Sequence, residues 1–168
     1  MRTVLLIGTN HVYQRPDIRG SEEFRTLIED SREEHDIKII AEEMSLDVLH
    51  KYGATESSCK QVADSIGIPH LYCDPSYKEQ KKLGIKQPGR ERDPVADAIR
   101  EDYWLEHILK QNSWPVLFIC GADHTESFRD LLQANDIVVC MCCSKDGDFQ
   151  KTGCCDVSGR DQRTRARP

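Results

Sequence analysis

Two short apolar runs, far apart in the chain, each lead directly into a Gly-x-x-His motif. Residues 4–7 precede Gly8-Thr9-Asn10-His11, and residues 116–120 precede Gly121-Ala122-Asp123-His124. Continuous apolar runs of this length are typical of strands buried on both faces of a parallel sheet. Such sheets bind ligands outside the carboxyl ends of their strands. We therefore expect His11 and His124 to arrive at the same edge of one sheet.

The rest of the chain alternates between strand and helix patterns. Further apolar runs at 37–41, 70–73 and 136–141 predict three more strands. Helical spacing of apolar residues predicts helices after Ser21, at 45–49, 57–65 and 95–110, and after His124. This alternation predicts an α/β fold with a single doubly wound, mostly parallel sheet and helices on both faces.

We expect one α/β hydrolase-like domain over residues 1–145 of the 168-residue chain. A basic loop at 78–93, where six Lys or Arg stand against three acids, interrupts the pattern. It reads either as a solvated connection or as a lid over an anionic substrate. The polar segment 146–168, which contains cysteine and arginine, is expected to be a flexible tail.

Composition narrows the class of protein. A formal charge of −6 makes wholesale nucleic-acid binding unlikely. No apolar run approaches the roughly 20 residues of a membrane span, so no membrane partner is expected. Because the N-terminus shows no signal peptide, we expect a cytoplasmic protein whose eight cysteines are reduced. The spacing of the C-terminal cysteines does not match the usual zinc knuckles, although a zinc site there stays open.

Two carboxylates follow the second predicted strand. Glu42 and Glu43 are adjacent, so their side chains should leave the strand on opposite faces, and only one should reach the histidines. Glu42 is our first choice, with Glu43 as the substitute. The helix dipole should also keep each histidine neutral in the first turn of its helix. Asp74, at the end of the third strand, is a weaker candidate.

Two kinds of chemistry fit these residues. His11, Glu42 and His124 could hold a divalent cation, such as manganese, cobalt or zinc, with positions open for water. That cation would lower the pKa of bound water toward about 7. Without a metal, the histidines and Glu42 or Glu43 could run general acid–base hydrolysis. The sequence leaves both schemes open.

Over roughly residues 3 to 140 the chain resembles the superfamily of the TraB and Tiki proteins, the haem-binding ChaN-type proteins and the erythromycin esterases. The matching features are two Gly-x-x-His motifs, a glutamate after the second strand and an Arg-acid pair on the helix before the second motif: Gly8 with His11, Glu42 or Glu43, Arg100-Glu101, and Gly121 with His124. The resemblance implies an α/β fold and, in several branches, hydrolysis at this site. Tiki-like members imply a manganese- or cobalt-dependent protease, and the esterases imply cleavage of a macrolide lactone.

We accordingly expect a hydrolase for a small-molecule or peptide substrate that could be anionic. Arg100 would bind that substrate or orient Glu42 through an ion pair. Further substrate-binding residues would be Asn10, Asp74 and Asp123. One alternative is a non-catalytic module that binds a nucleotide, haem or peptide at the same edge. Another is an interaction protein whose basic segments contact nucleic acid. A homodimer is compatible with each of these.

Overall fold

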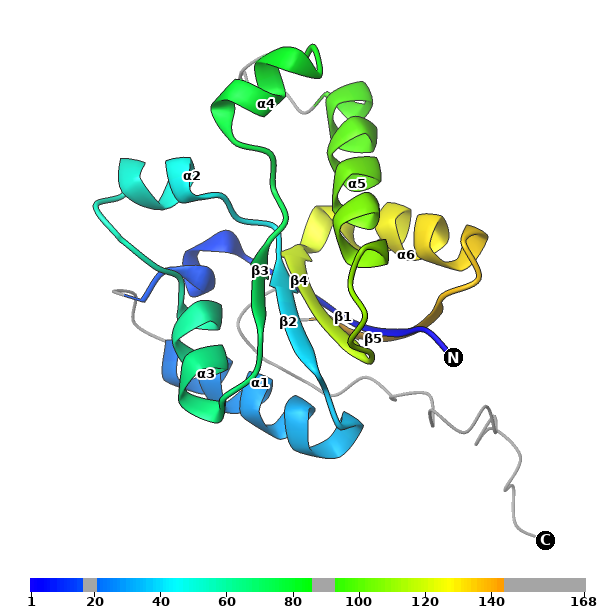
Figure 1. Cartoon of the computed structure of the whole chain (residues 1–168). Coiled ribbons are helices and arrows are strands. Elements are labelled where there is room, and N and C mark those ends of the chain that lie inside the picture. Colours follow the sequence, from blue (N-terminus) through cyan, green and yellow to red (C-terminus); the bar gives the residue numbers. More distant parts are fainter. Residues whose placement is uncertain (17–20, 86–92, 144–168) are drawn as a thin grey trace, which may run out of the picture.

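The computed structural model describes residues 1–16, 21–85 and 93–143. Its five strands form one all-parallel sheet in the order β3-β2-β4-β1-β5 (Figure 1). The strands are β1 (Thr3–Thr9), β2 (Ile39–Glu42), β3 (His70–Tyr72), β4 (Val116–Gly121) and β5 (Val138–Cys143). Each overlaps one of the five predicted apolar runs, so the α/β fold class is confirmed.

Helices cover both faces of the sheet. On one face lie α1 (Ser21–His35) and α3 (Ser58–Ile66), and on the other lie α5 (Pro94–Leu109) and α6 (Thr125–Ala134) (Figure 1). The shorter helices α2 (Leu46–Lys51) and α4 (Tyr77–Lys82) follow the carboxyl ends of β2 and β3. Two 3₁₀ turns, η1 (His11–Gln14) and η2 (Ala122–His124), follow β1 and β4. The doubly wound arrangement is therefore as predicted.

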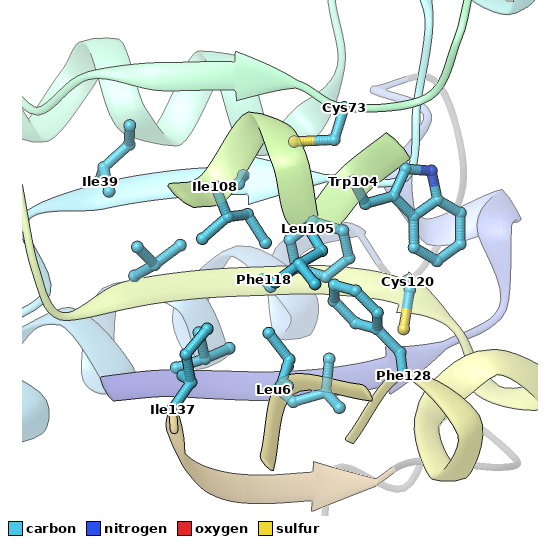
Figure 2. Packing of buried hydrophobic residues seen from close by; sticks show 14 residues of the cluster. Leu6, Ile39, Cys73, Trp104, Leu105, Ile108, Phe118, Cys120, Phe128 and Ile137 are labelled. Atoms are coloured by element: carbon cyan, nitrogen blue, oxygen red, sulfur yellow. The ribbon is translucent and has the colours of Figure 1, made fainter. Parts of the chain in front are cut away.

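An aromatic cluster fixes α5 and α6 to the sheet. The ring centroid of Trp104 lies 5.7 Å from that of Phe118 and 5.4 Å from that of Phe128, and all three side chains are fully buried (Figure 2). Burial of each large side chain contributes roughly 2 to 3 kcal/mol. Polar residues on the same two helices are consequently held in fixed positions over the ends of the strands.

Local capping explains where two of the helices begin. The Ser57 side chain accepts a hydrogen bond from the backbone N–H of Lys60 at the start of α3. Asp93 accepts hydrogen bonds from the first N–H groups of α5, and Pro94 occupies the first position of that helix. Ser45 stands at the cap position of α2 but makes no side-chain cap bond.

The prediction of an irregular loop at 78–93 is wrong for the first part of that range. Residues 78–82 belong to the helix α4 (Tyr77–Lys82). A capping box begins this helix: Ser76 Oγ accepts from the Glu79 N–H at 3.3 Å, and the Glu79 carboxylate accepts from the Ser76 N–H at 2.8 Å. Residues 86–92 of the loop and the tail at 146–168 lie outside the described residues. Among residues 1–16, 21–85 and 93–143, the helices include no candidate for a membrane span.

Candidate active site

The two Gly-x-x-His motifs end neighbouring strands, because β1 pairs directly with β4. The chain leaving β1 continues to α1 on one face, whereas the chain leaving β4 continues to α6 on the other face. Adjacent parallel strands whose connections go to opposite faces define the point where α/β sheets bind ligands. His11 and His124 are therefore delivered to the expected edge.

Both imidazoles converge on one carboxylate oxygen. His11 Nε2 lies 3.6 Å from Glu43 Oε1, and His124 Nε2 lies 3.5 Å from the same atom. The Glu43 and His124 side chains are almost fully buried, with 1% and 7% of their surface exposed, whereas 51% of the His11 side chain is exposed. The cluster thus has a buried anchor and one ring in contact with solvent.

The expectation that Glu42 is the carboxylate reaching the histidines is corrected by this geometry. Successive side chains of a strand point to opposite faces, and Ile40 of β2 packs with α1 and α3. Glu42 therefore points to that side, and Glu43 points toward α5. The backbone N–H of Glu43 donates to the Ile119 carbonyl at 2.8 Å, which holds Glu43 against β4.

Glu43 is held as a carboxylate. Its Oε1 accepts from Arg100 Nη2 at 2.5 Å, and its Oε2 accepts from the Gly121 N–H at 2.7 Å. Burial alone would raise the pKa of Glu43, but the charges of His11, Arg100 and His124 and the Gly121 hydrogen bond outweigh it. The pKa of Glu43 consequently lies below its ordinary value.

Arg100 bridges two acids. Its Nε donates to Asp74 Oδ1 at 2.8 Å while its Nη2 reaches Glu43, and Trp104 Nε1 donates to the same Asp74 oxygen at 3.1 Å. Burial raises the pKa of Asp74 even though Arg100 opposes the change. Of the two roles expected for Arg100, its contacts match the orientation of a glutamate, with Glu43 in the place of Glu42. Asp74, expected beside the substrate, holds Arg100.

The pKa of His124 shifts in the direction opposite to that expected at a helix start. His124 Nδ1 lies 2.7 Å from Glu101 Oε1, and Glu101 also accepts from Ser127 Oγ at 2.7 Å. Burial alone would lower the pKa of His124, but the Glu101 hydrogen bond and the charges of Glu43 and Asp97 outweigh it. The pKa of His124 therefore lies above the ordinary 6.5 of histidine. Acids on both sides of the ring override the helix dipole.

Each motif glycine makes room for the other motif. A Cβ atom on Gly8 would stand 2.3 Å from Thr125 Cγ2, and one on Gly121 would stand 2.8 Å from His11 Nε2. The strands pair with Gly8 opposite Cys120 and Thr9 opposite Gly121, so the two glycines are offset by one residue and face opposite sides. Close approach of the chain explains both glycines, because neither has a positive φ. The φ of Gly121 is −59°.

A buried polar network, which the sequence reasoning missed, lies behind His11. His11 Nδ1 is 2.9 Å from Gln14 Oε1, and Gln14 Nε2 donates to Glu42 Oε2 at 2.7 Å. Glu42 Oε1 also accepts from Ser57 Oγ and lies 2.8 Å from His70 Nε2. The three-residue spacing from His11 to Gln14, one turn of a helix, is the only sequence signal that points to this contact.

The two remaining candidates lie on the surface. Asn10 is exposed, and its side chain accepts a hydrogen bond from the Val12 N–H, which caps η1. Asp123 is exposed beside His124 in η2. Each precedes one of the two histidines in the chain, and the expected contact of both with a substrate stays a prediction.

The side chains around Glu43 are poorly arranged for a metal ion. Within residues 1–16, 21–85 and 93–143, no group of three His, Cys, Asp or Glu side chains is arranged to hold an ion. Arg100 already donates to the Glu43 oxygen that both histidines face, and its positive charge opposes a cation there. Burial raises the pKa of the Cys59 and Cys73 thiols, so these side chains are poor ligands. Cys154 and Cys155 lie outside the described residues.

No family model matches the sequence, and neither the curated proteins nor the solved structures contain a match to this chain.

Proposed function

We propose that the protein is a hydrolase that uses general acid–base catalysis at the cluster of His11, Glu43 and His124. The observation that carries the proposal is the convergence of two imidazole Nε2 atoms on one buried Glu43 oxygen, with the rings in different environments. Environments that separate the proton affinities of neighbouring groups are the means by which enzymes assign an acid and a base.

His11 is suited to be the base, because its half-exposed ring allows Nε2 to take a proton from an incoming water molecule. His124 is suited to be the acid, because its raised pKa keeps it protonated nearer to neutral pH. Its imidazolium would stabilise a developing oxyanion or protonate the leaving group. Glu43 would stabilise the positive charge of whichever imidazole is protonated during the reaction. Arg100 would hold Glu43 in place.

A metal-dependent version of the hydrolase is the second candidate. It is favoured by the excess of acids around the cluster, where Asp74, Asp97 and Glu101 stand against the single charge of Arg100. Manganese, cobalt or zinc would there polarise the substrate and activate water. The ligands would be His11, His124 and Glu43, and Arg100 would have to release Glu43 Oε1 for a cation to bind. We therefore rank this version below the acid–base one.

The test is a screen for hydrolysis by the full chain. Chromogenic carboxylate esters, phosphoesters and fluorogenic peptides would be offered in buffer treated with chelator, and again with added manganese, cobalt or zinc. The His11→Ala variant should lower kcat/KM roughly 10²- to 10⁴-fold, the usual contribution of a general base. We choose His124→Gln over His124→Ala because the His124 ring packs against Trp104, with ring centroids 5.0 Å apart.

The exposed His50 on α2 supplies a matched control, and His50→Ala should leave the rates unchanged. Activity that survives chelator supports the acid–base version, and activity restored only by a metal supports the second candidate. Equal rates for the parent protein, His11→Ala and His124→Gln would contradict both. The expected alternative, a binding module for a nucleotide, haem or peptide, would then be preferred.

A further inference from the structure

Gln14 stands between the half-exposed ring of His11 and the buried acid Glu42. It is fully buried, and its amide contacts His11 Nδ1 on one side and Glu42 Oε2 on the other, at 2.9 and 2.7 Å. Nothing in the acid–base scheme above requires either contact. The pair of hydrogen bonds nevertheless determines which nitrogen of His11 carries the proton.

The direction of each hydrogen bond follows from the chemistry of the groups. A carboxylate accepts hydrogen bonds and donates none, so the Gln14 nitrogen must face Glu42. The Gln14 oxygen then faces His11 and also only accepts, so the proton of the neutral ring must lie on Nδ1. The lone pair consequently remains on Nε2, the atom that faces Glu43 Oε1.

Glu42 is itself fixed by two other parts of the fold, the N-cap of α3 and the strand β3. It is fully buried, and it accepts from Ser57, which also caps α3, and from His70 Nε2 on β3. The hydroxyl of Tyr72 accepts from the backbone N–H of Ser57 at 3.2 Å. These contacts prevent the carboxylate from turning away, so the orientation of Gln14 is imposed from the interior of the protein.

We infer that Glu42 and Gln14 are positioning residues that hold His11 in the Nδ1–H tautomer and so reserve its Nε2 for the site. The tautomer itself is a property of the fold, whereas its value for catalysis rests on the proposed function. Where comparable partners of metal-bound histidines are removed, activity falls roughly 10- to 100-fold. We expect a loss of kcat/KM in that range when Gln14 is replaced by leucine.

Nitrogen NMR of the full chain labelled with ¹⁵N-histidine tests the inference. The His11 signals would be assigned by their absence from the His11→Ala spectrum. At a pH high enough for the His11 ring to be neutral, the parent protein should show the Nδ1–H form. In Gln14→Leu this signature should be lost in favour of the mixed tautomers of an unconstrained imidazole, with a partial loss in Glu42→Gln.

Gln80→Leu is the matched control, because Gln80 is also a buried glutamine, and it donates to the Pro75 carbonyl of a different segment. It should leave the His11 tautomer unchanged. A parent protein with His11 in the Nε2–H form, or an unchanged tautomer in Gln14→Leu, overturns the inference. An unchanged tautomer in Glu42→Gln removes the part assigned to Glu42. If the tautomer responds as expected while His11→Ala retains full activity, the positioning stands and the proposed hydrolase fails.

Discussion

The Nε2 atom of His11 lies 2.8 Å from the point where a Cβ atom on Gly121 would stand. Gly121→Ala should therefore displace the His11 ring. Because that ring is half exposed and is the far end of a side chain, it can move at little cost, about 1 kcal/mol or less in the free energy of unfolding. Hydrolytic activity should fall to the level of His11→Ala. Activity assays and urea unfolding of the same preparation measure the two effects.

Gly8→Ala provides the contrast. Its Cβ atom would stand 2.3 Å from Thr125 Cγ2 and 3.2 Å from the Ala122 Cα, so the obstacle includes backbone. We expect a loss of roughly 1 to 3 kcal/mol in unfolding free energy, the usual cost of overpacking a core. If both alanine variants were equally stable, the structure would be wrong about the closeness of β1 to η2.

Glu43→Gln should abolish activity and destabilise the fold. The change removes the buried carboxylate charge that Arg100 contacts, and we expect a loss of roughly 3 kcal/mol, the lower end for a broken buried ion pair, because Asp74 remains beside a partly exposed Arg100. Since the pKa of Glu43 is lowered on folding, its charge stabilises the protein above the ordinary pKa of 4.5, and this contribution is lost as the pH falls through the lowered value. Thermal unfolding measured from pH 5 downward should decline less steeply in the variant.

The fold itself follows from the sequence because continuous apolar runs and helical spacing are strong local signals. The choice between Glu42 and Glu43 does not follow from the sequence. Both faces of β2 are apolar, with Ile39, Ile40 and Ala41 all buried, so no alternation of polar and apolar residues indicates which face each glutamate takes. Only the packing of β2 against its neighbours decides which glutamate meets the histidines. Gln14 was missed for a similar reason, because its partner Glu42 is 28 residues away in the chain.

The raised pKa of His124 predicts an alkaline limb of the pH profile above 6.5, where the acid loses its proton. The folded state binds this proton more tightly than the unfolded state. Its stabilising contribution is therefore complete below pH 6.5 and is lost as the pH rises through the raised pKa. Glu101→Gln should move the limb and the NMR titration of His124 to lower pH. An unmoved titration would show that Glu101 does not control this ring.

Arg100→Lys should be a severe change although it keeps the charge. The guanidinium donates from Nε to Asp74 and from Nη2 to Glu43, and a single ammonium group cannot reproduce this fork. We expect kcat/KM to fall at least about tenfold, as a misplaced Glu43 no longer spans the two histidines. Lys110→Arg, at an exposed pair with Glu106, is the control and should be neutral. Full activity in Arg100→Lys would indicate that charge alone suffices.

The offset of the two glycines across β1 and β4 has a practical meaning for protein engineering. Grafting this pair of histidines onto another parallel sheet would require copying the stagger together with the residues. If the two glycines were paired directly across the strands, both would face the same side of the sheet. The ring of the first histidine would then meet a side chain at the place where Gly121 leaves room for it.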